Sequence, residues 1–235
     1  MTEDLPSVLV LAAVEAELEP FRRQLELLDS VCAQRLVLTG AGKTGAAIVA
    51  TRALSKAPFA LAVQIGVAGA LPGSRLEPGD VVVATSEFLA DEGVEAPTGF
   101  LDLLALGLPS AVIGGRAVHN EVPLSIPAPA TLSAIEASAA GTYAVRAGRL
   151  ATVSTGSGTD SRALEIATRS SALAETMEGA AAALAALHHG VPFFEVRGIS
   201  NRAGDRDRGS WVIETAADRA AEAASLLVRL ELSRG

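Results

Sequence analysis

Cysteine, aromatic residues and basic charge are all scarce in this chain of 235 residues. A single cysteine, Cys32, cannot form a disulfide within the chain or a cysteine metal cluster, which excludes a disulfide-stapled fold. Aromatic residues make up only 3% of the sequence, whereas half of it is hydrophobic, so the core has to be built from closely packed Ala, Val and Leu. That composition favours an α/β layered fold.

The acidic balance and the lack of a long apolar run exclude two kinds of partner. The net charge is −8, and nucleic-acid binding needs clustered Lys and Arg, so we expect no nucleic acid. The longest apolar run, 59–71, is interrupted by Gln64 and is shorter than the ~20 residues of a membrane-spanning helix, so we expect no membrane. The first residues are acidic where a secretory signal would be basic. The expected location is the cytoplasm.

Continuous apolar runs of strand length alternate with helical patterns along the chain. Runs at 7–14, 60–65 and 81–84 are typical of strands that are buried on both faces. The alternation predicts a single α/β domain over residues 1–235 with a largely parallel sheet. Residues 96–140 contain five prolines and no sustained period, so we expect a surface insertion of loops with a helix around 131–140.

Polar residues stand where these strands end. Glu17 directly follows the first apolar run, Glu178 opens an Ala-rich helix, and a later run ends in Arg197, Ser200 and Asn201. Ligands of parallel α/β sheets bind beyond the carboxyl ends of strands, so we expect these side chains to share a site. An alternative for Glu17 is that it only complements a helix N-terminus through the helix dipole.

A glycine turn at 40–45 matches two familiar motifs by accident. Its G-x-G-x-x-G spacing fits a dinucleotide fingerprint, but that fold needs an acidic residue about 20 positions later, and none stands there. A phosphate loop would place its first glycine at Val37, inside a strand. We interpret the segment as a tight turn whose N–H groups are free to meet a polar ligand. A second polar glycine turn, 155–160, is another candidate lining.

Taken together, these segments resemble the nucleoside phosphorylase and nucleosidase superfamily, in particular the methylthioadenosine/adenosylhomocysteine nucleosidases and the futalosine hydrolases of menaquinone biosynthesis. The resemblance is carried by A-x-E-x-E at 13–17, T-G-x-G-K at 39–43, G-x-A-G at 66–69, G-D-V-V-V at 79–83, M-E-G-A at 177–180 and V-R-x-I-S at 196–200. It implies a phosphorylase-like three-layer α/β/α fold with a central twisted mixed sheet. It also implies a homodimer or larger assembly, with neither a cofactor nor a metal.

The resemblance also implies roles for individual residues. Glu17 would activate the attacking water beside Arg197, Met177 would pack on the sugar, and Glu178 would accept hydrogen bonds from the ribose hydroxyls. N-glycoside cleavage passes through a cationic sugar, which nearby carboxylates stabilise. The other substrate-binding residues implied are Ser200, Gly66, Val67, Thr159 and Asp160.

Asn201 is the departure from the family pattern that bears most on the substrate. Nucleosidases of adenine compounds carry an aspartate at this place. An amide can donate to O6 of a 6-oxopurine and accept the proton at N7, which points to hypoxanthine as the leaving base. Because Asn is not a strong proton donor, Asp205 and Asp207 are weak alternatives for protonating the base. Further departures are Val67 in place of a serine and Thr159 in place of an aromatic residue.

Hydrolysis is favoured over phosphorolysis because the first loop, 14–18, carries Glu15 and Glu17 where phosphate-using relatives carry glycine and arginine. We therefore expect a futalosine hydrolase that takes a nucleoside and water. The alternatives are a methylthioadenosine/adenosylhomocysteine or aminofutalosine nucleosidase that releases adenine, and a non-catalytic nucleoside-binding module. Residues 86–120, with Arg116, are candidates for holding the carboxylated aromatic part of futalosine.

Overall fold

The computed structural model describes residues 5–204 and 206–234. Its main sheet is mixed and has the strand order β11-β10-β4-β12-β3-β1-β2. The strands are β1 (Ser7–Ala12), β2 (Ala33–Leu38), β3 (Leu61–Ala70), β4 (Val81–Leu89), β10 (Val145–Thr152), β11 (Ala174–Thr176) and β12 (Phe193–Arg202). Parallel pairing dominates, and β12 runs antiparallel to β4. The expected α/β class with a central mixed sheet is confirmed.

Five of these strands pair with one another in a closed ring. The short strand β11 pairs with β10 on one edge and with β3, antiparallel, on the other, where Glu175 faces Gly69. Strands β3, β12, β4, β10 and β11 therefore form a closed ring. Because β11 runs antiparallel to β3, the residues that follow Thr176 lie beside earlier residues of β3, toward Val67. In this way the end of β11 is brought beside the end of β1.

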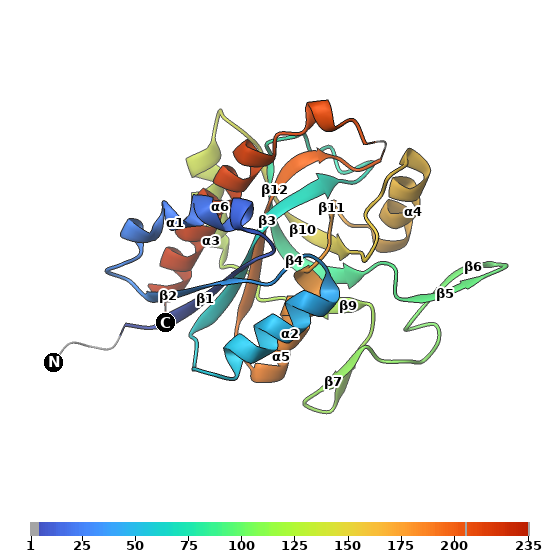
Figure 1. The fold of residues 1–235 in the computed structure, drawn as a ribbon, viewed down its shortest axis with the longest axis horizontal. Coiled ribbons are helices and arrows are strands. Elements are labelled where there is room, and N and C mark those ends of the chain that lie inside the picture. The colour runs from blue at the N-terminus through green and yellow to red at the C-terminus, as the bar shows by residue number, and fades with distance from the viewer. Residues whose placement is uncertain (1–4, 205, 235) are drawn as a thin grey trace.

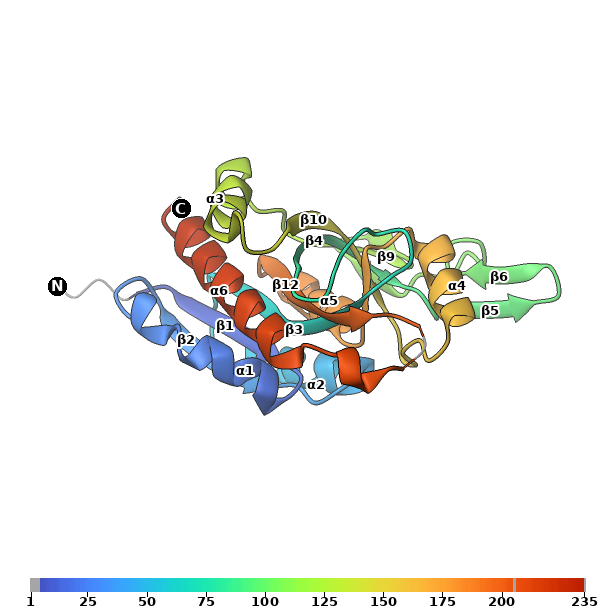
Figure 2. The ribbon, with the colours of Figure 1, turned by 90° about the horizontal axis from the view of Figure 1, so that it is seen from above.

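Helices cover the two faces of the sheet (Figures 1 and 2). Helices α1 (Glu15–Arg22), α3 (Pro129–Ala139) and α6 (Ile213–Leu232) pack on one face, and α2 (Lys43–Leu54) and α5 (Gly179–His189) pack on the other. Helix α4 (Asp160–Ser170) packs against the end of β10. The alternation expected of strands is visible in β1, where Val8 and Val10 join the first core and Leu9 and Leu11 join the second.

Small residues let the layers approach closely, which explains how a core with few aromatics is filled. A Cβ atom on Gly198 of β12 would overlap the backbone of Ala216 in α6. Helix α5 buries seven small residues, Gly179, Ala180, Ala181, Ala182, Ala183, Ala185 and Ala186. Dense packing of this kind makes up for the short side chains. Among the helices of the described part, none is long and apolar enough to span a bilayer.

The region expected to be an insertion contains hairpins as well as the expected helix α3. Strand β5 (Gly93–Ala96) pairs with β6 (Gly99–Asp102), and β7 (Ala111–Ile113) pairs with β8 (Arg116–Val118). The β5–β6 hairpin projects from the body in Figures 1 and 2, and the β7–β8 hairpin projects in Figure 1. Strand β9 (Glu121–Pro123) joins the main sheet beside β4, and β4 continues to Leu89, beyond the expected end at position 84. These strands are too short to show a period in the sequence. Two 3₁₀ turns, η1 (Leu25–Leu27) and η2 (Arg208–Ser210), complete the elements described.

Candidate active site

A pocket of about 330 Å³ opens where β1, β3, β11 and β12 end. Segments far apart in the sequence form it because the strand ring brings their ends together. The position agrees with the rule that ligands of α/β sheets bind beyond the carboxyl ends of strands. The lining residues are Ala13, Val14, Glu17, Ala41, Val67, Ala68, Gly69, Val153, Gly156, Ser157, Glu175, Thr176, Met177, Glu178, Ser200, Asn201, Gly204, Arg206 and Trp211.

Glu17 is buried in the first turn of α1, with 6% of its surface exposed. The N–H groups of Ala13 (3.0 Å) and Val67 (2.9 Å) donate to its two carboxyl oxygens. Burial raises the pKa of Glu17 above its ordinary value, although the charge of Arg197 and these N–H groups act in the opposite direction. A carboxylate that is fixed in place with a raised pKa suits a general base.

Gly66 makes room for this carboxylate. Its φ of +149° lies in a region that L side chains rarely adopt. A Cβ atom on Gly66 would lie 2.5 Å from Oε1 of Glu17 and 2.6 Å from Nη1 of Arg197. The position therefore requires glycine, whose role is to let two side chains converge beside β3. Gly66 itself is not among the lining residues of the pocket.

Arg197 on β12 is 1% exposed and lies among three carboxyl groups. Its Nε donates to Glu195 at 2.8 Å, its Nη2 lies 3.5 Å from Glu178, and its Nη1 lies 4.0 Å from Glu17. Burial lowers the pKa of Arg197, but the carboxylates raise it by more, so the guanidinium stays charged. Arg197 thus joins the two pocket carboxylates from behind the lining surface.

Glu178 is the residue before α5 and is held from the opposite side by the glycine turn at 40–45. The N–H of Gly42 donates to Oε1 of Glu178 at 2.8 Å, and Oε2 faces Arg197. The N–H that we expected to be free for a ligand therefore fixes a protein carboxylate instead. Ala41 of the same turn lines the pocket beside Met177 and Glu178.

Asn201 lines the pocket with its amide held in one orientation. The hydroxyl of Ser200 donates to Oδ1 of Asn201 at 2.7 Å, and Nδ2 donates to the backbone oxygen of Arg202 at 2.9 Å. Each of these atoms keeps one further hydrogen bond to give or accept. Asn201 therefore presents one donor and one acceptor to a ligand, and Ser200 acts as its support.

The remaining predicted residues occupy different positions. Val67 and Met177 line the pocket. Thr159 and Asp160 are exposed at the start of α4, outside the lining, where the Thr159 hydroxyl accepts the N–H of Arg162 at 3.3 Å. Asp207 accepts the N–H of Gly209 at 3.1 Å and caps η2, whereas Asp205 lies outside the described residues.

The pocket is also lined by Ser157, from the turn at 155–160 that we expected to line a ligand, and by Glu175, Arg206 and Trp211, which the sequence pattern did not single out. Glu175 accepts hydrogen bonds from the N–H (2.8 Å) and hydroxyl (2.6 Å) of Ser157, and burial raises its pKa. The guanidinium of Arg206 lies 5.1 Å from the ring centre of Trp211. Glu175 gave no clear signal in the sequence, since its strand β11 has only the three residues Ala174–Thr176. Arg206 was hidden in an alternating charge run.

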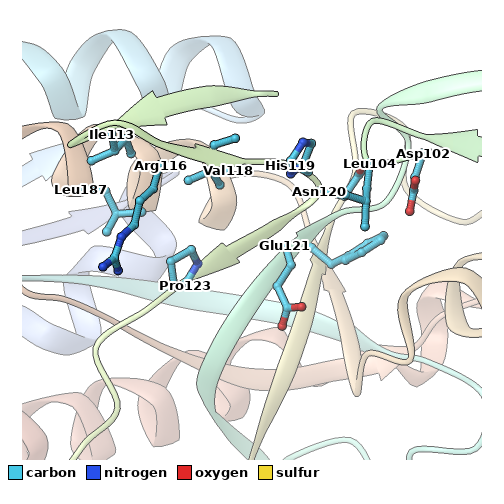
Figure 3. Close-up of a pocket in the computed structure, with 12 residues that line it drawn as sticks. Asp102, Leu104, Ile113, Arg116, Val118, His119, Asn120, Glu121, Pro123 and Leu187 are labelled. Carbon is cyan, nitrogen blue, oxygen red and sulfur yellow. The ribbon is translucent and has the colours of Figure 1, made fainter. Parts of the chain in front are cut away.

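A second cavity of about 450 Å³ lies apart from this site, between the β8–β9 segment and the end of α5 (Figure 3). Arg116, His119 and Leu187 line it, and it shares no lining residue with the first pocket. Arg116 is therefore absent from the lining of the pocket that holds Glu17. Among the described residues, no group of three or more His, Cys, Asp or Glu side chains is arranged to hold a metal ion.

Comparisons with known proteins agree with this geometry. The family model of the phosphorylase superfamily matches residues 11–233. A futalosine hydrolase from Streptomyces coelicolor is 40% identical over 162 residues, which cover 68% of this chain and 62% of that protein. A futalosine hydrolase from Thermus thermophilus is 35% identical over 192 residues, which cover 81% of this chain and 76% of that protein. The matched segment thus spans slightly less than two thirds of the Streptomyces coelicolor relative.

Solved structures share the fold at low identity. A methylthioadenosine/adenosylhomocysteine nucleosidase from Neisseria meningitidis, in complex with methylthio-immucillin-A, superimposes with a TM-score of 0.77 at 23% identity, covering 96% of this chain and 100% of that chain. A futalosine hydrolase mutant from Helicobacter pylori gives a TM-score of 0.75 at 22% identity, covering 95% and 99%. The family model, the strand ring and the pocket beyond its carboxyl ends lead to one conclusion, that this chain belongs to the phosphorylase superfamily.

Proposed function

We propose that this chain hydrolyses the N-glycosidic bond of futalosine, releasing hypoxanthine and dehypoxanthine futalosine. The proposal is supported by the relatives from Streptomyces coelicolor, Acidothermus cellulolyticus and Thermus thermophilus, which are futalosine hydrolases 33–40% identical to this chain. The observation that carries the chemistry is that Glu17 and Glu178 line one pocket and are joined behind it by Arg197.

Glu17 and Glu178 have different roles in the proposed reaction. Glu17, held by two backbone N–H groups, accepts the proton of the water that attacks C1′, a role typically worth ~10² to 10⁴-fold in rate. Glu178 accepts hydrogen bonds from the ribose hydroxyls, and Met177 packs on the sugar. Both carboxylates stabilise the positive charge that develops on the ring as the bond to the base breaks. Arg197 keeps the two anions together without entering the lining surface.

Asn201 supports hypoxanthine as the leaving base. Its amide is oriented by Ser200 and Arg202, and it has one free donor and one free acceptor, which match O6 and the protonated N7 of a 6-oxopurine. Adenine presents donors at both places. Donation from Nδ2 to O6 stabilises the electron pair that the base receives as the bond to C1′ breaks, and solvent water supplies the proton at N7. A mismatched base would leave buried polar groups unpaired, which can discriminate by ~10⁴-fold.

Water suits this pocket better than phosphate. The lining carries the carboxyl groups of Glu17, Glu175 and Glu178, and its only cationic side chain within the described chain is Arg206. A phosphate dianion next to these carboxylates would be repelled. We infer that Arg206 and Trp211 instead receive the carboxylated aromatic part of futalosine, since a guanidinium binds a carboxylate and an indole ring packs on an aromatic group.

The test is base release in phosphate-free buffer. We expect free hypoxanthine from futalosine, with much less base from inosine and methylthioadenosine. Comparable release of adenine from methylthioadenosine would favour the adenine nucleosidase instead. If no base is released from any of the three, although they bind, the chain is a nucleoside-binding module. Adding phosphate should leave the rate unchanged, because a phosphorolytic enzyme would depend on it.

We further propose that the chain forms a homodimer or larger assembly. We also propose that it acts in the cytoplasm and catalyses a step of menaquinone biosynthesis. Large apolar side chains on α2 and the insertion support an assembly: Ile48 is 62% exposed, and Leu104 is 64% exposed. Light scattering coupled to size exclusion measures the mass in solution. A mass of one chain at micromolar concentration contradicts the assembly but leaves the proposed reaction open to its own test.

A further inference from the structure

Two carboxyl groups that the proposed mechanism does not use are buried next to the site. Glu87 on β4 and Glu195 on β12 are both 0% exposed, and neither lines the pocket. Both converge on Gly179, where an added Cβ atom would collide with Oε1 of Glu87 and with Oε2 of Glu195. Oε1 of Glu195 accepts the Nε–H of Arg197 at 2.8 Å, whereas Oε2 of Glu195 has no hydrogen-bond partner among the described residues.

The surroundings of Glu87 fix how its carboxyl group is oriented. The Thr152 hydroxyl accepts the N–H of Ala180 at 2.8 Å, so its own proton points to Oε2 of Glu87 at 2.6 Å. That leaves Oε1 of Glu87 on the side of Gly179, where Glu195 also lies. The hydroxyl of Thr176 is 3.4 Å from the same oxygen.

Two adjacent buried carboxylates are unfavourable because both charges lose their hydration and repel each other. Arg197 can neutralise only one of them, and it is also shared with Glu17 and Glu178. A carboxylic acid at Glu87 removes one charge and supplies the donor that Oε2 of Glu195 lacks. Burial first, and then the charge of Glu195, raise the pKa of Glu87 well above its ordinary value.

We propose that Glu87 is a neutral carboxylic acid whose O–H donates to Oε2 of Glu195, and that this pair positions Arg197 for the hydrolysis proposed above. The positioning role rests on that proposed function, but the location of the proton does not. A protonated carboxyl that donates a hydrogen bond in an apolar site is a known arrangement in enzymes. The charged groups that face Glu87 are Glu195 and Arg197 on β12, while β10 and β11 present the hydroxyls of Thr152 and Thr176.

The pair explains why Arg197 stays 4.0 Å from Glu17. A single full charge on Glu195 holds the guanidinium through Nε, so Nη2 makes only a long hydrogen bond of 3.5 Å to Glu178 and Nη1 stays 4.0 Å from Glu17. If Glu195 lost that charge, Arg197 would move toward Glu17. A close ion pair would lower the pKa of Glu17 and weaken it as a base. Glu195 and Glu87 are therefore positioning residues that act through Arg197.

Infrared spectroscopy tests where the proton is, without any substrate. The spectrum of the wild type minus that of Glu87→Gln, taken at neutral pH, should show the carbonyl stretch of a protonated carboxylic acid, which carboxylates lack. Glu136→Gln, at an exposed carboxylate on α3, is the matched control and should lose no such band. A difference spectrum without the acid band shows that Glu87 is ionised and overturns the proposal.

Kinetics test the positioning role. Glu87→Gln should keep kcat within about threefold, because the amide N–H donates to Glu195 as the acid does. Glu195→Gln should lower kcat by about tenfold or more, and the acid limb of its kcat/KM profile should move to lower pH as Arg197 approaches Glu17. A merely structural residue would not move that limb. If Glu195→Gln leaves the limb in place, or Glu87→Gln loses as much rate as Glu195→Gln, positioning is refuted.

Two outcomes separate this inference from the proposed function. If the wild type releases no base from futalosine, the proposed function fails, and the infrared band still decides the state of Glu87. If Glu195→Gln does not fold, Glu195→Asp replaces it, because the shorter side chain keeps the charge but draws it away from Nε of Arg197. It should show the same shift of the acid limb to a smaller extent, and an unshifted limb counts against the role.

Discussion

Replacing Asn201 by Asp should change which base leaves. The aspartate has two acceptors and no donor, so the bond to the backbone oxygen of Arg202, 2.9 Å long in the wild type, is lost together with donation to O6 of hypoxanthine. A buried acceptor left without a donor, as O6 would be, costs about 1–3 kcal/mol. At 1.4 kcal/mol per tenfold, kcat/KM for futalosine should fall about 5- to 150-fold.

The assay separates free hypoxanthine and adenine by chromatography, with futalosine and its 6-amino counterpart as parallel substrates. Asn201→Asp should gain activity on the 6-amino compound, whose base offers donors to both carboxylate oxygens. Asn201→Ala is the control at the same site, since it removes both hydrogen bonds without adding charge and should lose activity on both substrates. If Asn201→Asp keeps its preference for futalosine, the amide does not select the base. A circular dichroism melt of each variant checks that it is folded.

Three further predictions concern the carboxylates and the arginine of the pocket. Glu17→Gln should reduce kcat by ~10² to 10⁴-fold with substrate binding retained, measured by calorimetry and single-turnover kinetics, and an unchanged kcat removes Glu17 from the mechanism. Because burial raises the pKa of Glu17, which has to be ionised to act as a base, kcat/KM of the wild type should fall on acidification at a pH above 4.5. If the fall of kcat/KM on the acid side occurs only at or below pH 4.5, the assignment of Glu17 as the base is contradicted. Arg206→Gln should raise KM for futalosine about tenfold or more but leave KM for inosine unchanged, and equal effects on both would place Arg206 outside the aromatic subsite.

The pH dependence of stability gives one more prediction. A carboxyl whose pKa is raised by folding keeps its proton in the native state after the unfolded chain has lost it, so the free energy of unfolding falls with rising pH across that window. Glu87 should cause such a fall from about pH 4.5 upward, ending at its folded-state pKa. Glu87→Gln does not titrate and should show a smaller fall in urea titrations between pH 5 and 8. Equal slopes for both proteins would show that Glu87 is not protonated in the native state.

Much of the site was predictable because it lies where the hydrophobic pattern changes. Glu17, Glu178 and Asn201 stand at the ends of apolar runs, and the rule for parallel sheets places such ends together. The helix at 129–139 was also predictable from its composition. The hairpins of the insertion were missed because strands of three or four residues are too short to show alternation.

The buried carboxyl pair was missed for a different reason. Glu195 is a single polar residue in an apolar run, which does not change the pattern that predicts the strand. Glu87 follows Thr85 and Ser86, so it lies beyond position 84, where the expected strand ended. The physical signal was nevertheless present, since a charge within a buried strand needs a partner. The partner of Glu195, Arg197, is two residues along the same strand, on the same face. Glu87 could be placed only from the sheet order, because β4 and β12 are neighbours in the sheet but lie far apart in the sequence.

The strand ring has a consequence for how the protein is made. Its closing contact joins β3 to β11, and β12 is inserted between β3 and β4, so segments from the last third of the chain complete contacts with the first third. Such nonlocal pairing folds slowly because long loops must close first. During synthesis Glu17 and Gly66 leave the ribosome well before Glu178 and Arg197. The pocket can therefore form only once most of the chain has emerged, and ligand binding would report that folding is complete.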